Sequence, residues 1–240
     1  MARFVLVHGA FHGAWCWEPF TGELEARGHS VETFDLPGSG DDATPVSDVT
    51  LDAYADRICE VLSSRDEPAV LVAHSMGGVA ATHAASRCPE RIASLIYVTA
   101  FLPADGQSLI DLTHLPEGAD DQVQARMVVG GDPPTATLTA QDAREVFYAE
   151  CDPADAARAA ERIAPQPLAP FGAAVSAPPD GLTRSYVICT QDRAIPPALQ
   201  RRMASERATG EVAELDTDHS PFLSRPRELA ELLDRFAAAR

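Results

Sequence analysis

The sequence predicts an α/β fold in which a mostly parallel, twisted sheet is covered by helices on both faces. Short apolar runs alternate along the chain with stretches whose apolar residues recur at helical spacing. The short runs are apolar throughout, which is typical of parallel strands buried on both faces. The chain has 240 residues, of which 45% are hydrophobic, and this is enough for one large buried core.

The first half of the chain holds four predicted strands. They are expected at Phe4–His8, Ser30–Asp35, Ala69–Ala73 and Ile92–Thr99. Three helices are expected between them, at Trp15–Arg27, Leu51–Leu62 and Met76–Arg87. Gly28 ends the first helix, apolar residues on one face define the second, and Pro89 stops the third.

The end of the chain returns to the same alternation. Strands are expected at Arg184–Thr190 and Glu211–Leu215, and helices at Pro196–Arg207 and Arg227–Ala239. We therefore expect residues 1–101 and 179–240 to form one core domain.

Residues 102–178 interrupt this rhythm and predict a helical lid inserted into the core domain. The stretch is rich in Pro, Ala and Asp and has no convincing buried strand. Thr139 opens a capping-box pattern for a helix through Ala149, and Asp152-Pro153 is typical of the start of a helix over Ala154–Ile163. Helices inserted at strand ends commonly cover a site. The alternative is a small packing domain without a role.

Composition excludes several classes of function. The formal net charge is −17, which argues against nucleic acid and anionic membranes as partners. The chain contains no lysine, so a lysine Schiff base or a Walker-A lysine is excluded. The five cysteines are widely spaced, which favours free buried thiols, and no apolar run is long enough for a signal peptide or a membrane span. We expect a cytoplasmic monomer or homodimer.

The most informative stretch joins a buried strand directly to a helix through a serine. It reads Ala73-His74-Ser75-Met76-Gly77-Gly78, which is the G-x-S-x-G nucleophile elbow with alanine in place of the first glycine. This sharp turn projects the Ser75 hydroxyl from the sheet edge at a helix N-terminus. There the Met76 amide can donate to a developing oxyanion.

A serine nucleophile needs a base and an acid from the same edge of the sheet. His219 follows the last predicted strand and is the expected base. Asp192 follows the strand before it and is the expected acid. The rival acids are Asp105, Asp216 and Asp218. Asp216 and Asp218 are close to the histidine in sequence, and we expect these two to be solvated.

The glycine-rich loop after the first strand is expected to complete an oxyanion hole. Within it the Ala10 amide is the preferred donor and the Phe11 amide the second choice. His8 and His12 lie on this loop, but a metal site is not expected because they are not on a helix and no H-E-x-x-H motif accompanies them. The loop also lacks G-x-G-x-x-G, so it is not a dinucleotide site.

The substrate pocket is expected to be apolar. Phe11 and Phe147 are the preferred candidates for its wall. Core packing is the competing explanation for the others, which are Trp15, Phe101, Leu102, Tyr148, Phe171 and Phe222.

Taken together, these motifs resemble the plant methylesterase and hydroxynitrile lyase branch of the α/β-hydrolase superfamily and its bacterial esterase relatives. By position, the resemblance implies Ser75 as nucleophile, Asp192 as acid, His219 as base, and the Ala10 and Met76 amides as the oxyanion hole. Lyase members carry a lysine after the histidine and a threonine after the first-strand histidine. Ser220 and Gly9 stand at those places here, which favours the esterases.

The resulting prediction is a carboxylesterase-type serine hydrolase that acts on small or methyl esters of apolar or aromatic acids and needs no cofactor. Thioesters and lactones remain open as substrates, and a lyase or cyclase acting on a secondary metabolite could use the same base. The alternative that is not an enzyme is a receptor module that binds a ligand at this site without turnover.

Overall fold

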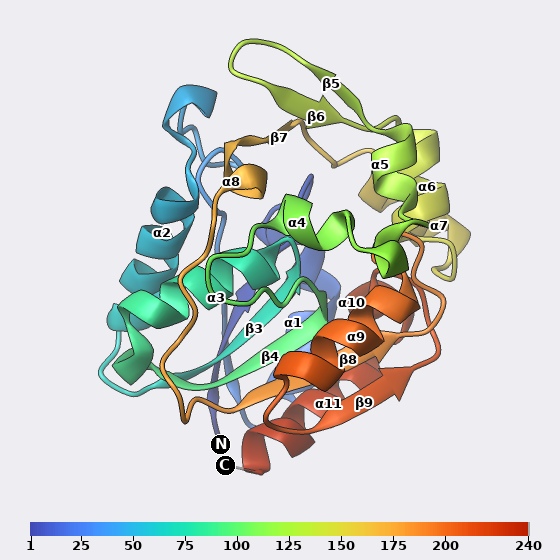
Figure 1. Cartoon of the computed structure of the whole chain (residues 1–240). Helices are drawn as coiled ribbons and strands as arrows, with labels where there is room; N and C mark the ends of the chain where they lie inside the picture. Colours follow the sequence, from blue (N-terminus) through green and yellow to red (C-terminus); the bar gives the residue numbers. More distant parts are fainter. Residues whose placement is uncertain (240) are drawn as a thin grey trace.

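A computed structural model describes residues 1–239 of the chain, and its centre is a six-stranded parallel sheet (Figure 1). The strand order is β2-β1-β3-β4-β8-β9, so β2 is added on one side of β1 and the later strands are added in turn on the other side. The strands are β1 (Arg3–Val7), β2 (Ser30–Thr33), β3 (Ala69–Ser75), β4 (Ile92–Ala100), β8 (Arg184–Cys189) and β9 (Val212–Leu215). The predicted α/β fold is confirmed.

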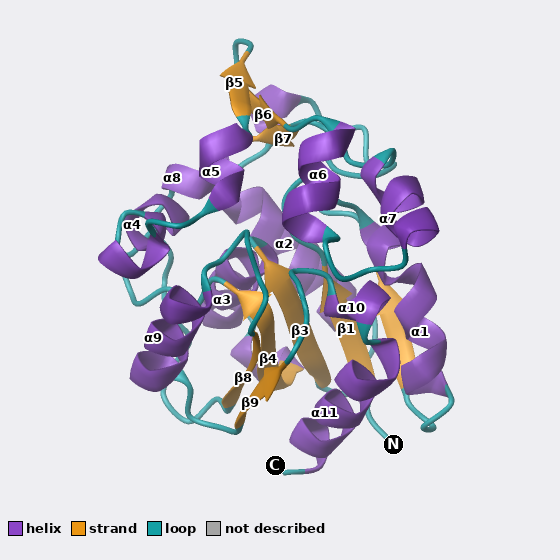
Figure 2. Cartoon of the chain, turned by 90° about the vertical axis from the view of Figure 1, so that its right-hand side faces the viewer, coloured by secondary structure: helices purple, strands orange, loops and turns teal. Residues whose placement is uncertain are grey.

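Helices cover both faces of this sheet, as the solid apolar runs require. Side chains of β1 alternate between the faces, with Phe4 and Leu6 in one core cluster and Val5 and Val7 in the other. The first cluster includes residues of the first and last helices, and the second includes residues of the two helices that flank β3 in sequence. These two pairs of helices lie on opposite faces of the sheet (Figure 2). The helices are α1 (Glu18–Glu25), α2 (Leu51–Ser63), α3 (Gly77–Arg87), α9 (Pro197–Arg207), α10 (Pro221–Ser224) and α11 (Pro226–Ala238).

The predicted boundaries differ from the structure in small ways. The first predicted helix is divided, because residues Ala14–Trp17 form a 3-10 turn (η1) before α1 begins at Glu18. Two further 3-10 turns, η2 (Val46–Asp48) and η3 (Pro89–Arg91), lie in connections. Within residues 1–239, every helix is too short or too polar to cross a bilayer.

The segment between β4 and β8 lies beyond the carboxyl ends of the strands (Figures 1 and 2). Both predicted helices are present as α6 (Ala140–Phe147) and α7 (Pro153–Ala160), with the side chains of Thr139 and Asp152 as N-caps. The segment is not wholly helical. It also contains α4 (Leu109–Thr113), η4 (Pro116–Gly118), α5 (Gln122–Arg126), α8 (Ala169–Gly172) and three short antiparallel strands, β5 (Val128–Gly130), β6 (Thr135–Thr137) and β7 (Gln166–Pro167).

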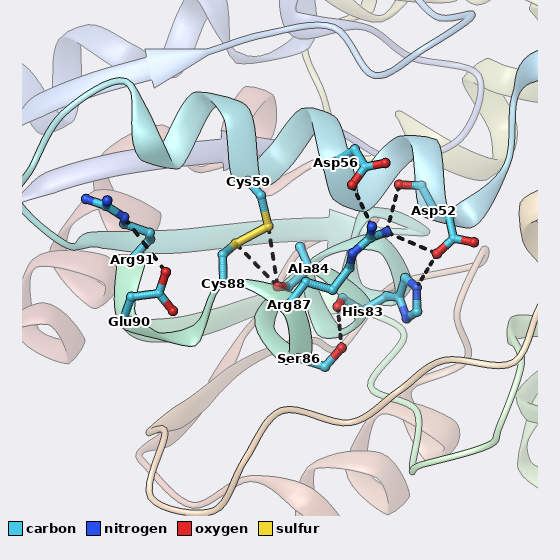
Figure 3. Close-up of a disulfide and its surroundings, with 10 residues drawn as sticks. All are labelled: Asp52, Asp56, Cys59, His83, Ala84, Ser86, Arg87, Cys88, Glu90 and Arg91. Carbon is cyan, nitrogen blue, oxygen red and sulfur yellow. Dashed lines mark hydrogen bonds and ion pairs between the residues drawn. A yellow bond between two sulfur atoms is a disulfide. The ribbon is translucent and has the colours of Figure 1, made fainter.

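A disulfide joins Cys59 of α2 to Cys88, which follows α3 (Figure 3). The expectation of free thiols is wrong for this pair and holds for Cys16, Cys151 and Cys189, which are free and buried. The two cysteines are 29 residues apart in sequence and come together only because α2 packs beside α3. Disulfides persist in oxidising compartments, so this pair removes the support that free thiols lent to a cytoplasmic location.

Candidate active site

Ser75 ends β3 in a left-handed backbone conformation, with φ at 54°. The helix α3 begins two residues later and packs so closely that glycines are required. A Cβ at Gly77 would lie 2.6 Å from the His8 carbonyl oxygen, and one at Gly78 would lie 2.1 Å from the Phe101 carbonyl oxygen. The strand, the strained serine and the close helix together form the predicted elbow.

Backbone strain is concentrated around this serine. Among residues 1–239, the non-glycine residues with positive φ are Phe11, Ser75 and Thr99. Each follows or ends a strand of the sheet, at the carboxyl edge: Phe11 after β1, Ser75 at the end of β3 and Thr99 near the end of β4. Strained residues persist only where their surroundings hold them, and they commonly mark functional sites.

Asp192 and His219 form a buried pair at the same edge. The His219 Nδ1 lies 2.7 Å from Asp192 Oδ2, and both side chains are almost fully buried. Because an ionised carboxylate only accepts, Nδ1 carries the proton and Nε2 of the neutral ring is left as an acceptor. This is the tautomer that a general base for a serine hydroxyl requires.

Sequence reasoning missed the groups that hold Asp192. The Thr99 hydroxyl and the Gln200 amide donate to Oδ2, the latter at 3.1 Å, and the amides of Ala194 and Ile195 donate to Oδ1 at 2.7 and 3.0 Å. These donors compensate the cost of burying the carboxylate. The Thr99 residue that makes this contact has a positive φ, and no sequence pattern predicts its role.

A hydrogen bond joins the loops of His219 and Ser75, and it is made by His74, the residue directly before the serine. His74 Nε2 donates to the His219 carbonyl oxygen at 2.8 Å, and the two imidazole rings lie 4.5 Å apart between centroids. The ring of Phe147 lies 5.5 Å from that of His219 on another side. Among the described residues the Ser75 hydroxyl has no hydrogen-bond partner, a common state before substrate is bound.

The rival carboxylates do not contact His219. Asp105 accepts from the Ala177 amide, and Asp216 is exposed as predicted. The prediction that Asp218 is solvated is wrong: its side chain is fully buried and accepts from the Ser220 amide at 3.1 Å and the Glu150 amide at 2.8 Å. Asp218 is buried because it caps backbone amides between its own loop and the segment after α6.

The loop after β1 passes directly over Ser75. A Cβ at Gly9 would lie 2.7 Å from the Ser75 Cβ, so only glycine permits this approach. The Phe11 amide, the second-choice donor, already donates to Gln166 Oε1 at 3.1 Å. Within residues 1–239, the amides of Ala10 and Met76 have no acceptor, which leaves them available to an incoming oxyanion.

The histidines of this loop are engaged by protein groups. The Leu36 amide donates to His8 Nε2 at 3.0 Å, and the Tyr148 hydroxyl lies 2.6 Å from His12 Nε2. Burial lowers the pKa of His8 and lowers that of His12 to about 3, so both rings are neutral at physiological pH. Their ring nitrogens are therefore occupied in positioning the loop. Among residues 1–239, no cluster of His, Cys, Asp or Glu is suited to hold a metal.

A cavity of about 380 Å³ opens above Ser75 and is predominantly apolar. Phe11 and Phe147 line it as predicted, together with Phe101 and Phe171. Leu102 lies in the core, and Trp15, Tyr148 and Phe222 line a separate cavity of about 210 Å³, so these four are not part of this pocket. Most of the remaining lining comes from the segment between β4 and β8: Leu109, Ile110, Thr113, His114, Asp121, Val123, Gln124, Met127 and Leu168.

Comparisons with known proteins agree with this architecture. The model of the alpha/beta hydrolase family matches residues 4–232. Methylesterase 7 of Arabidopsis thaliana is 34% identical over 245 residues, which cover 96% of this chain and 94% of the relative. The crystal structure of polyneuridine aldehyde esterase is similar with a TM-score of 0.88 at 26% identity, covering 98% of each chain. A pyrethroid hydrolase from Sphingobium faniae JZ-2 has a TM-score of 0.85 at 27% identity, covering 99% of this chain and 98% of the other.

Proposed function

Because the chain belongs to the alpha/beta hydrolase family, in its methylesterase branch, and is a carboxylesterase-type hydrolase, we propose that Ser75, His219 and Asp192 are its catalytic triad. The observation that carries this proposal is the position of Ser75. It stands in a strained turn on the floor of an apolar cavity, and its loop is fastened to the buried His219–Asp192 pair.

In the proposed reaction His219 Nε2 accepts the Ser75 proton while Oγ attacks the ester carbonyl carbon. The carbonyl oxygen becomes an oxyanion between the amides of Ala10 and Met76. His219 then gives the proton to the departing alcohol, which leaves an acyl-enzyme. A water molecule, deprotonated by His219, releases the acid and regenerates Ser75. Asp192 keeps the imidazole in its tautomer and stabilises the imidazolium.

The cavity favours a small, uncharged ester with an apolar or aromatic acyl group. Its volume suits a ligand at the small end of the range that protein pockets accommodate. The aromatic rings of Phe11 and Phe147, which both line the pocket with Ser75, lie 6.0 Å apart between centroids. The lining includes no arginine to pair with a carboxylate, so a neutral ester suits the pocket better than its charged acid product.

We assign the segment between β4 and β8 the role of a lid. It supplies most of the pocket wall, and residues from α4, α5 and α6 all reach the cavity. A covering segment of this kind limits the access of bulk water to the reacting carbonyl and strengthens the hydrogen bonds of the oxyanion hole.

The test compares the wild type with Ser75→Ala on p-nitrophenyl acetate and on a panel of methyl esters. We expect kcat/KM to fall by about 10⁴-fold or more, because the nucleophile is lost. Ser86→Ala is a matched control on α3, since its hydroxyl only caps the His83 carbonyl oxygen, and it should retain full activity. Full activity in Ser75→Ala would refute the proposal.

The same panel separates the other functions. Thioesters and lactones are included, and products are identified by mass, so that a carbon–carbon lyase would show a cleavage other than hydrolysis. Stoichiometric retention of a ligand without turnover of any ester would instead indicate a receptor module.

A further inference from the structure

We propose that Gln166, in the segment between β4 and β8, is a positioning residue for the oxyanion hole. It would act through Phe11, the residue that directly follows Ala10 in the loop after β1. This inference rests on the proposed function, and it adds that the inserted segment, besides covering the pocket, sets the geometry of the loop that stabilises the transition state.

Gln166 is almost completely buried, and its amide makes three hydrogen bonds. Oε1 accepts from the Phe11 amide at 3.1 Å, while Nε2 donates to the Tyr54 hydroxyl at 3.1 Å and to the Pro167 carbonyl oxygen at 2.9 Å. The orientation of the amide is determined by its partners, because a flipped amide would place its NH₂ against the Phe11 N–H. The Gln166 oxygen is therefore committed to Phe11.

Phe11 needs such a partner because its backbone is left-handed, with φ at 64°. A non-glycine residue adopts this conformation only when its surroundings hold it. The segment around Gln166 holds both polar groups of the residue, since the Ala164 amide also donates to the Phe11 carbonyl oxygen at 2.9 Å. With Phe11 held in this way, the preceding Ala10 amide keeps its free N–H beside Ser75.

Gln166 is itself held in place by the small antiparallel sheet. It pairs with Ala136 of β6, which is fully buried. The rigid support means that the Gln166 side chain is preorganised before substrate binds, as an oxyanion hole requires. The pairing of Gln166 with β6 and its hydrogen bond to Phe11 thus link the small antiparallel sheet to the loop of the proposed oxyanion hole.

The experiment measures kcat and KM of Gln166→Leu on a p-nitrophenyl ester and its affinity for a trifluoromethyl ketone, which forms a tetrahedral oxyanion on an active serine. We expect kcat to fall about 10- to 100-fold with little change in KM, because the shift of a donor weakens only the transition state. The affinity for the trifluoromethyl ketone should fall by a similar factor. Tyr54→Phe is the matched control, since it removes another hydrogen bond of Gln166 and leaves the Phe11 contact; its kcat should stay near that of the wild type.

Thermal unfolding of each variant distinguishes this role from a purely structural one. If Gln166→Leu is unstable, Gln166→Met, which fills the same volume with a flexible side chain, replaces it. A kcat within twofold of the wild type, or an unchanged affinity for the trifluoromethyl ketone, would overturn the inference while the esterase assignment stands. Failure of both variants to fold would assign Gln166 to the folding core and overturn a role in positioning. Loss of the proposed function would instead show as an inactive wild type.

Discussion

Valines in two regions of this molecule show how differently its parts are ordered. Val70 and Val72 in β3 are completely buried, whereas Val128 and Val129 in β5 are 66% and 53% exposed. Both pairs lie in strands, but β3 has a hydrogen-bonded neighbour on each side and helices on each face, and β5 pairs only with β6. The central sheet is therefore held in place by neighbouring strands at its sides and by apolar packing on both of its faces.

The inserted segment packs around an apolar cluster of its own, which includes Val146, Phe147 and Tyr148, and it also makes polar contacts with loops of the sheet. The Glu150 amide reaches Asp218, the Tyr148 hydroxyl reaches His12, and Gln166 reaches Phe11. All three acceptors or donors on the core side lie within three residues of a proposed catalytic group. The exposed β5 strand is thus weakly packed, whereas other parts of the inserted segment are joined to loops beside the proposed catalytic groups, so the sheet and this hairpin should respond differently to perturbation.

Acid should have the largest effect, and it should act on the core side. Burial lowers the pKa values of His8, His12 and His74, that of His12 to about 3, below the ordinary value of 6.5. The unfolded chain therefore binds more protons below pH 6.5, so this stability is present above pH 6.5 and is lost as the pH falls toward the folded-state pKa. His12 alone should cost about 2 kcal/mol between pH 7 and pH 5. The lowered pKa values of His8 and His74 add to this loss, which makes the combined effect the largest.

Urea unfolding at several pH values measures this loss. On acidification, the free energy of unfolding of the variant His12→Asn should decrease less than that of the wild type. The difference should equal the contribution of the single His12 imidazole. An identical pH dependence in the wild type and the variant would contradict the assignment of a buried neutral imidazole.

Reduction of the Cys59–Cys88 disulfide should have the next largest effect. It closes a loop that contains β3, Ser75 and α3, and the entropy of a loop with a sequence separation of 29 corresponds to about 3–4 kcal/mol. The double variant Cys59→Ala, Cys88→Ala should unfold at lower urea but keep its kcat in the folded range, because the disulfide lies outside the pocket lining. Equal unfolding midpoints with and without a reductant would rule out a stabilising crosslink in the wild type.

Two glycine substitutions provide the most direct comparison of the regions, with the smallest effects. At Gly78 a Cβ meets the Phe101 carbonyl oxygen, so Gly78→Ala should destabilise the protein by about 2–3 kcal/mol through overpacking. At Gly130 in β5 no atom lies within 4 Å of an added Cβ, so Gly130→Ala should change stability by no more than about 0.5 kcal/mol. Calorimetric melting of both variants checks the pair, and similar shifts would show that the hairpin is as tightly packed as the contact between α3 and the end of β4.

Much of the fold was predictable because buried parallel strands leave an unmistakable apolar pattern. The strands from Arg3 to Ala100 and the helices α2 and α3 lie close to their predicted limits. The short strands β5 and β6 were not predicted because each has only three residues, which is too short for an alternating pattern to be recognised. The disulfide was missed because widely spaced cysteines reveal a pairing only when helix packing is known.

For the candidate site, the division is similar. Ser75 ends a strand and Asp192 and His219 follow strands, and the carboxyl ends of parallel strands meet at one edge, so the elbow motif and the topology predicted their convergence. Thr99, Gln200 and Gln166 were not predicted, since their roles depend on which backbone or carboxylate group they meet in space.

By itself, the order of residues determined the sheet, the elbow at Ser75 and the candidate chemistry, because periodicity and local turn geometry are properties of neighbouring residues. Only the tertiary structure decided which groups hold Asp192, which side chain occupies the Phe11 amide, and which aromatic rings line the pocket. Those outcomes depend on contacts between residues far apart in sequence, where a buried polar group must find a partner and an apolar cavity must be enclosed from several sides.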